Sequence, residues 1–266
     1  MSTFLSRVST SGNPAPLRAI IYGQPGDGKT TCAAKAPNPI FMDLEGGLGI
    51  VSADVLPTPI SYEEVTEQVK ELLNAEHEYR TLVIDAIDAV EPLIWQATCD
   101  EHLKKHIQDF PYSTGYVRAD AYWIRFLQLL DALRARRNMN IILISHAQAA
   151  HYDDPTVGTY TRWEPNLHKR ANALLLKWSD MIGFFNQEKV AMDKGDTSSN
   201  RSVRTSRHTG SRVLSFESDG SFVAKNRHGI KGSIAVSEDA GWQAVTEALK
   251  SAWAARAKTT NKEKAA

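Results

Sequence analysis

Residues 23 to 31 combine side chains and backbone freedom suited to holding phosphate groups. They fit the pattern G-x-x-x-x-G-K-[ST] in full, between an apolar run at 19–22 and a segment at 31–35 that can form a helix until Pro37 ends it. In this order of strand, glycine loop and helix, successive N–H groups point at a polyphosphate. Gly23, Gly26 and Gly28 allow backbone angles and a close approach that a Cβ atom would obstruct. The stretch therefore predicts a site for a nucleoside triphosphate.

The loop lysine and threonine have distinct expected tasks. Lys29 reaches the β and γ phosphate oxygens, and the hydroxyl of Thr30 ligates Mg²⁺. We expect ATP and Mg²⁺ as the bound groups. The loop residues expected to hold the nucleotide are Gly23, Gln24, Pro25, Gly26, Asp27, Gly28, Lys29, Thr30 and Thr31.

Acidic residues close two further apolar runs. Asp85 ends the run 81–85 and is expected to hold Mg²⁺ through water, opposite Thr30; a helix-capping role is the alternative, and the same role is expected for Asp88. Hydrolysis also needs a group that orients or deprotonates water. Glu45 is the candidate, because it ends a strand expected beside the strand that leads into the glycine loop, which is a P-loop. Ligands bind at the carboxyl ends of the strands in open α/β sheets. Asp43 remains an alternative to Glu45.

Short apolar runs alternate with helical patterns through the first 147 residues. Strands are expected at 19–22, 39–45, 81–85 and 140–146, helices at 88–107 and around Tyr122 to Leu133, and a loop at 108–118. This alternation predicts an α/β fold with a mostly parallel twisted sheet flanked by helices.

The later part of the chain changes character. A polar loop is expected from 147 to about 166, then β-strands at 181–192 and 202–216 and a last helix that Ser237 caps. The expected organisation is a flexible N-terminal arm (1–16), a core with a β-rich C-terminal extension (17–236), a C-terminal helix (237–257) and a disordered tail (258–266).

Composition limits the cellular setting. The net charge is zero and the pI is about 7.1, so a nucleic-acid contact would have to be a local patch. The two cysteines form no metal or disulfide pattern, and no apolar run approaches the length of a membrane span. We expect a cytoplasmic protein without a membrane partner, located in the host cytoplasm if a phage encodes it.

Four segments, 23–30, 41–45, 82–85 and 142–148, occur in the order and spacing of the RecA-type ATPase core, which the chain resembles over about 18–232. The resemblance implies that Glu45 activates water. It also implies that a polar residue after the fourth strand senses the γ-phosphate; this role falls on His146, with Gln148 as the alternative. The family usually has glutamine there, so His146 departs from its pattern.

A later stretch extends the resemblance. Lys225-Asn226-Arg227 is similar to the Lys-Asn-Lys stretch by which bacterial RecA reaches the ATP of a neighbouring subunit. This implies that Lys225 and Arg227 act in trans, in a homo-oligomeric ring or filament with ATP at the subunit interfaces. Residues 226–230 and the small size most resemble the phage RecA-core-only ATPases that anneal single-stranded DNA.

Single-stranded DNA is the expected partner, together with a single-strand-binding protein. The loops at 108–118 and 149–170 match the DNA-binding loops of RecA cores and mix aromatic and cationic residues, which suits stacking on bases and pairing with phosphates. The residues expected to bind DNA are Tyr112, Tyr116, Arg118, Arg162, Trp163, Lys169 and Arg170. The arginine-rich segment 201–212 is either a phosphate-tracking hairpin or a solvated one.

The implied function is that of a DNA-dependent ATPase that oligomerises on single-stranded DNA and promotes annealing or homologous recombination. Two alternatives stay open. One is a P-loop kinase of a small molecule or nucleotide, which would need an arginine-rich lid. The other is a nucleotide-gated adaptor or packaging factor.

Overall fold

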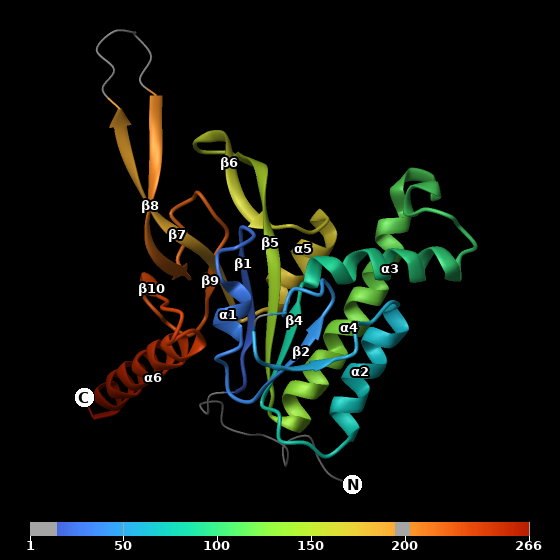
Figure 1. Cartoon of the computed structure of the whole chain (residues 1–266), viewed down its shortest axis with the longest axis horizontal. Coiled ribbons are helices and arrows are strands. Elements are labelled where there is room, and N and C mark those ends of the chain that lie inside the picture. Colours follow the sequence, from blue (N-terminus) through green and yellow to red (C-terminus); the bar gives the residue numbers. More distant parts are fainter. Residues whose placement is uncertain (1–14, 50, 195–202, 266) are drawn as a thin grey trace.

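A computed structural model describes residues 15–49, 51–194 and 203–265, and its centre is a twisted sheet with helices on both faces (Figure 1). The strands are β1 (Arg18–Gly23), β2 (Pro39–Asp43), β3 (Asp54–Leu56), β4 (Thr81–Asp85), β5 (Asn140–Asp154), β6 (Gly158–Pro165), β7 (Met181–Lys194), β8 (Val203–Ser215), β9 (Lys225–Asn226) and β10 (Ser233–Ala235). The helices are α1 (Lys29–Ala33), α2 (Tyr62–Asn74), α3 (Ile87–Glu101), α4 (Thr114–Arg137), α5 (Lys169–Trp178) and α6 (Trp242–Ala265), with short 3₁₀ helices η2 (Ile107–Asp109) and η3 (Pro111–Ser113).

The sheet is mostly parallel. In the described residues its order is β10-β8-β7-β1-β5-β4-β2-β3, and the block from β7 to β3 is parallel throughout. β8, β9 and β10 add an antiparallel extension at the C-terminal side. The predicted fold class, an α/β fold with a β-rich C-terminal extension, is confirmed.

Both faces of the parallel block are buried. Ile20 and Tyr22 of β1 pack with helices α2 to α5, whereas Ala19 and Ile21 pack with α1 and α6 on the other face. Side chains along a strand alternate between the faces, so a strand covered on both sides must be apolar at nearly every position. This explains the continuous apolar runs in the sequence.

The expected position of β2 is wrong. The sequence analysis places β2 beside the P-loop strand β1, but β5 and β4 lie between them in the sheet. Apolar continuity identifies a buried strand and says nothing about its neighbours, because strand order depends on pairings between distant parts of the chain.

The two loops expected to bind DNA are also more regular than predicted. At 149–170, β5 runs on to Asp154 and returns as β6, and α5 begins at Lys169. At 108–118, η3 follows η2 and α4 already begins at Thr114. Polar residues can form strands where cross-strand pairs support them; here the rings of Tyr152 and Tyr160 lie 5.5 Å apart.

Two smaller features complete the comparison with the sequence. The predicted cap of α2 is present, since the backbone N–H of Glu64 donates to Ser61 Oγ at 3.2 Å. At the other end of the chain, α6 continues through 258–265, where the sequence favours disorder. The arginine-rich segment lies partly outside the described residues.

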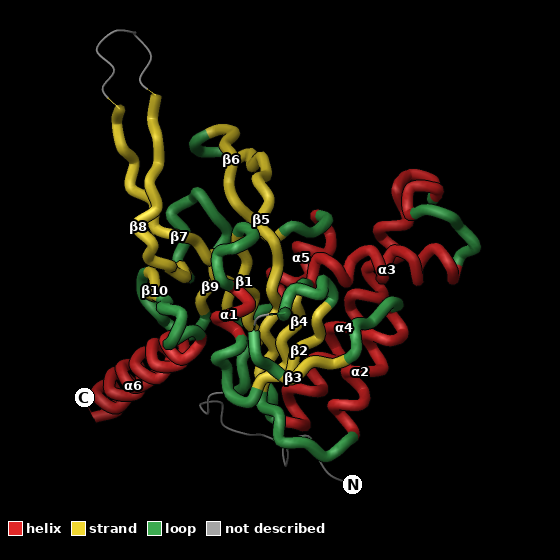
Figure 2. Tube along the Cα trace, in the orientation of Figure 1, coloured by secondary structure: helices red, strands yellow, loops and turns green. Residues whose placement is uncertain are grey.

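The β5–β6 hairpin, the β7–β8 hairpin and the connection from α3 to α4 all rise on the side of the sheet where β1, β4 and β5 run toward their carboxyl ends (Figure 2). Within the described ranges, no helix combines the length and the apolar character needed to cross a bilayer.

A buried carboxyl group ties α3 to the start of α5. Glu91 on α3 accepts hydrogen bonds from the backbone N–H of His168, the N-cap residue of α5, at 2.9 and 3.2 Å. Burial raises the pKa of Glu91 to about 7, although the hydrogen bond from His168 acts in the opposite direction. The folded chain therefore binds this proton at a pH where the unfolded chain has released it.

Stability should consequently fall as the pH rises from about 4.5 to about 7, because the folded state holds more protons than the unfolded state in that window. Glu91→Gln removes this titration while keeping an acceptor for His168. We expect the decrease in unfolding free energy across this window to be about 1–3 kcal/mol smaller in Glu91→Gln than in wild type. Urea unfolding at several pH values measures it. Glu63→Gln, on the exposed face of α2, is the matched control and should leave the slope unchanged. An equal slope in wild type and Glu91→Gln would contradict the assignment.

Candidate nucleotide site

The glycine loop follows β1 at the carboxyl edge of the sheet. Gly26 and Gly28 have φ values of 81° and 98°, in the left-handed region that favours glycine. A Cβ atom placed on Gly23 would lie 2.3 Å from the backbone oxygen of Phe185 on β7, so this position admits no side chain. The loop is closed by Asp27, whose carboxylate accepts from the N–H of Gln24 at 2.9 Å.

Lys29 lies buried within this loop. Its ammonium group donates to the backbone oxygens of Gly23 at 3.1 Å and Gln24 at 2.9 Å. Burial lowers the pKa of Lys29, and the nearby carboxylates of Asp27 and Asp85 counteract that effect. The charged amine is thus held at the loop that the sequence assigns to phosphate.

Thr30 and Asp85 meet directly, with the Thr30 hydroxyl donating to Asp85 Oδ2 at 2.6 Å. Burial raises the pKa of Asp85, while the hydrogen bond from Thr30 lowers it. A hydroxyl and a carboxylate oxygen in contact beside a phosphate loop are the hard ligands that Mg²⁺ prefers, so the residues present fit this ion.

Glu45, in the turn after β2, and His146, on β5, meet beside Asp85. His146 Nδ1 lies 3.6 Å from Glu45 Oε1 and 2.9 Å from Asp88 Oδ2, and the backbone N–H of His146 donates to Asp88 Oδ1 at 3.2 Å. Burial raises the pKa of Glu45, and the positive charge available at His146 opposes the shift. Asp88 therefore fixes both the backbone and the ring of His146, and His146 in turn faces Glu45.

Asp88 is the member of this group that sequence reasoning missed. It was assigned a helix-capping role, whereas its carboxylate turns to β5 and binds His146. Its place in the first turn of α3, three residues after Asp85, indicates that it lies near the carboxyl edge of the sheet, but this spacing does not show its contact with β5.

Asp43, the alternative to Glu45, and Gln148, the alternative to His146, both bind neighbouring backbone groups. Asp43 accepts from the backbone N–H groups of the turn that follows it, at 2.9–3.4 Å, so both of its oxygens hold that turn in place. Gln148 donates to the backbone oxygens of Pro165 and Leu167, both at 3.2 Å, and so braces β6 and the start of α5. Glu45 and His146 are the pair that meets at the loop edge.

Lys225 and Arg227 lie at the opposite edge of the sheet from the P-loop of their own chain. Residues 225 and 226 pair with the first two residues of β7, which lie level with the start of β1. From Ala19 to Gly23, β1 then runs roughly 13 Å further to the P-loop. Lys225 caps α5 by donating to the oxygens of Leu176 and Lys177 at 2.5 and 3.1 Å, and Arg227 lies 3.3 Å from Asp180.

Residues predicted to bind DNA on the α3–α4 connection divide into exposed and packed ones. Tyr112 is 99% exposed and has a positive φ of 53°. Arg118 is also exposed and lies 3.3 Å from His102. By contrast, the ring of Tyr116 stacks on His168 with centroids 4.2 Å apart.

Those on the β5–β6 hairpin and α5 divide in the same way. Arg162 lies over the ring of Tyr152 at 3.8 Å, and Lys169 is exposed. Trp163 packs against Phe184 in the core, so Arg162 and Trp163 are the packed residues. Arg170 is exposed like Lys169, although it is paired with Asp120. The packed residues position the hairpin and helix, and the exposed ones are available to a ligand.

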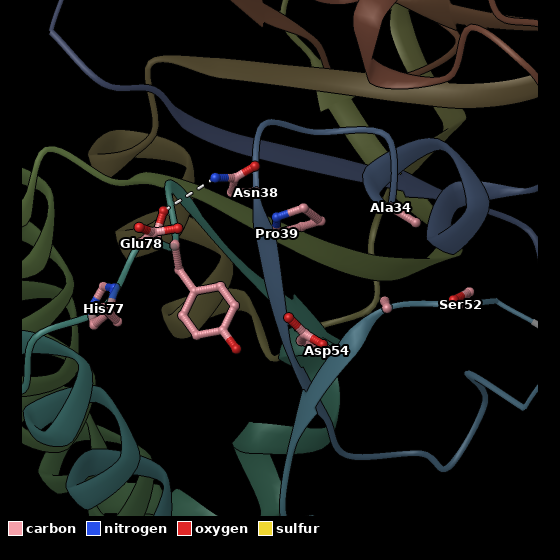
Figure 3. Close-up of a pocket in the computed structure, with 9 residues that line it drawn as sticks. Ala34, Asn38, Pro39, Ser52, Asp54, His77 and Glu78 are labelled. Carbon is pink, nitrogen blue, oxygen red and sulfur yellow. Dashed lines mark hydrogen bonds between the residues drawn. The ribbon is translucent and has the colours of Figure 1, made fainter.

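Two cavities differ in their relation to this site. One of about 710 Å³ lies at the amino end of β2, where Asn38 donates to the backbone oxygen of Glu78 at 3.3 Å (Figure 3). This is the edge opposite the P-loop. Another, of about 480 Å³, borders the P-loop at Gln24 and Pro25 and the β5–β6 hairpin at Trp163. The P-loop and the hairpin thus share a cavity wall.

Comparison with known proteins identifies a family. The family model described as "AAA domain" matches residues 15–228. No curated protein matches the chain. Among solved structures, the crystal structure of the RadB recombinase is similar over 84% of this chain and 89% of that one, at 16% identity and a TM-score of 0.46. These values are too low for the likeness to indicate a shared activity.

Proposed function

Because the chain belongs to the AAA domain family, we propose that it is an ATPase. We propose further, from the positions of its cationic and exposed aromatic residues, that its subunits assemble on single-stranded DNA and promote annealing. The observation that carries the nucleotide part is the meeting of Lys29, the Thr30–Asp85 pair and the Glu45–His146 pair at one edge of the sheet. Phosphate binding, charge neutralisation and activation of water each have a side chain there.

In this proposal the residues divide the work as follows. Backbone N–H groups of the loop and the Lys29 ammonium bind the β and γ phosphates. Thr30 and Asp85 hold Mg²⁺, which neutralises phosphate charge when bound. Glu45 orients and deprotonates the attacking water, a task that its raised pKa favours, and His146 senses the γ-phosphate while Asp88 holds it in place.

Glu45→Gln tests the chemical step. Turnover should fall by about 10²-fold or more, the scale of losing a general base, while ATP affinity changes little because the phosphates are held elsewhere. Steady-state turnover and equilibrium ATP binding measure the two effects. Asp43→Asn is the comparison variant: it loosens the turn after β2, so it should lower stability as well as activity. An active Glu45→Gln enzyme beside a stable, inactive Asp43→Asn enzyme would transfer the role to Asp43.

Action in trans is supported by the position of Lys225 and Arg227. At the sheet edge away from their own P-loop, these cations have a route to a nucleotide only if it is bound by another subunit. Arg227 is half exposed, and its partner Asp180 is also bound by Arg18 at 2.8 Å, so Asp180 keeps a cationic partner when Arg227 leaves. This arrangement supports the proposed assembly into a homo-oligomer with ATP between subunits.

Mixing two inactive variants tests trans action. Lys29→Ala damages the phosphate half of an interface and Arg227→Ala the other half, so co-assembled mixtures should regain part of the wild-type turnover. A mixture of Lys29→Ala with Glu45→Gln serves as the control, because both lesions fall in the same half and no rescue is expected. Equal turnover in the two mixtures would argue against a shared site.

DNA binding is supported by the exposed residues near the carboxyl edge. Tyr112 presents a whole ring to solvent on the α3–α4 connection, and Lys169 is exposed at the start of α5. The α3–α4 connection and the β5–β6 hairpin, which leads to α5, rise on the side of the sheet where its parallel strands run toward their carboxyl ends (Figure 1). Stacking and phosphate pairing from these positions suit a single strand, whose bases are available, better than a duplex. A single-strand-binding protein is the proposed partner in annealing.

Tyr112→Ala should weaken binding of labelled oligonucleotides by about 1–3 kcal/mol, with similar losses for different sequences, because every base has a face to stack. Tyr112→Phe keeps the ring and should bind like wild type. Lys169→Ala should reduce the salt dependence of binding, since one phosphate contact is lost. Fluorescence anisotropy with and without a non-hydrolysable ATP analogue measures all three. Absence of wild-type binding below about 10 μM near 100 mM salt would refute the DNA part and favour the small-molecule kinase.

A further inference from the structure

A second cation, Arg212, lies beside the P-loop, in the segment for which the sequence leaves open a phosphate-tracking or a solvated hairpin. A Cβ atom placed on Gly28 would lie 3.1 Å from Cζ and Nη1 of Arg212 and 3.3 Å from its Nε. The whole guanidinium group is therefore packed on Gly28, the residue directly before Lys29.

Strand pairing fixes the position of Arg212 relative to the P-loop. Arg212 sits on β8, where it pairs with Gln187 of β7, and its backbone oxygen accepts from the N–H of Val236 at 2.8 Å. β7 pairs in turn with β1, whose last residue opens the P-loop. The guanidinium is thus carried to the loop by two consecutive strand pairings within the same chain.

Among the ion pairs that the described residues show, Arg212 has one carboxylate partner, and that partner is exposed. Arg212 Nη1 lies 2.9 Å from Glu238 Oε1, but the Glu238 side chain is 71% exposed, whereas that of Arg212 is 24% exposed. An ion pair with so exposed a partner contributes little. Arg212 and Lys29 nevertheless place two cations around one glycine. A planar guanidinium presents several donors in a fork that matches phosphate oxygens, so a polyphosphate would balance this charge.

We propose that Arg212 is a ligand of the bound nucleotide's phosphates, supplied by the same subunit that supplies the P-loop. This rests on the proposed function and deepens it. The nucleotide site then has two cations from its own chain, Lys29 and Arg212, in addition to those proposed to arrive from a neighbour. The role of Arg212 is to bind di- and triphosphates, so its loss acts on affinity before it acts on the chemical step.

Isothermal titration of the full-length protein with MgADP and with a non-hydrolysable MgATP analogue tests the proposal. Arg212→Gln should weaken binding of both by tenfold or more, the scale of a lost hydrogen bond to a charged group. Arg212→Lys, which keeps the charge and loses the fork, should fall between this variant and wild type. Arg204→Gln, further out on β8, is the matched control and should bind within twofold of wild type.

Glu238→Gln separates binding from a purely structural role. It breaks the same ion pair and keeps the cation, so nucleotide affinity should stay within twofold of wild type or rise. A loss equal to that of Arg212→Gln would mean that the pair only fastens the segment after β10, and the inference would fall. It would also fall if Arg212→Gln bound like wild type while wild type bound tightly. If Arg212→Gln does not fold, Arg212→Lys decides, because wild-type affinity in that variant contradicts the fork. Absence of binding by wild type itself would instead remove the proposed ATPase function.

Discussion

The register of four parallel strands, β1, β5, β4 and β2, is the constraint on which the site depends. Backbone hydrogen bonds set Gly23 level with His146, Asp85 level with Ile144, and Asp43 level with Asp85. Side chains alternate along a strand, so a slip of one residue would turn each of them to the other face. Both faces are packed, so such a slip would exchange the side chains of the two cores, for example Ile20 and Tyr22 for Ala19 and Ile21, and would disrupt the packing of both. The hydrophobic core thereby fixes the relative positions of the groups that meet at the P-loop.

The same strands that carry the site continue into the protruding hairpins. β5 passes from His146, which faces Glu45, directly into the hairpin with β6. The backbone oxygen of Phe185 on β7 leaves no room for a side chain on Gly23. From Phe185, β7 continues into the hairpin with β8, which brings Arg212 to Gly28. A change at the phosphate site therefore has a short covalent path to surfaces that are proposed to bind DNA. Glu91 adds a second link, because it joins the helix that follows Asp85 to the start of α5.

Sequence reasoning was strongest where a feature is local. The glycine loop, the buried strands and the Ser61 cap follow from spacing and periodicity over a few residues. The order of the strands did not follow, and Glu45 was chosen on a mistaken neighbour relation although its side chain does meet His146. The polar residues of the β5–β6 hairpin lack an apolar alternation and so predict a loop, yet Gly158, with φ of 87°, marks the turn of the hairpin. The contacts of Asp88 with His146 and of Arg212 with Gly28 do not follow from local patterns, because each joins residues that are far apart in the chain.

ATP turnover of wild type and Lys29→Ala, each with and without a single-stranded oligonucleotide, tests the central claim most directly. Lys29 is buried in the loop and binds only backbone oxygens among the contacts that the described residues show, so its replacement removes the phosphate contact while leaving the strands paired. The account predicts wild-type turnover that the oligonucleotide raises, and a loss of about 10²-fold or more in Lys29→Ala. Equal turnover in the two proteins, or none in a folded wild type under either condition, would contradict it.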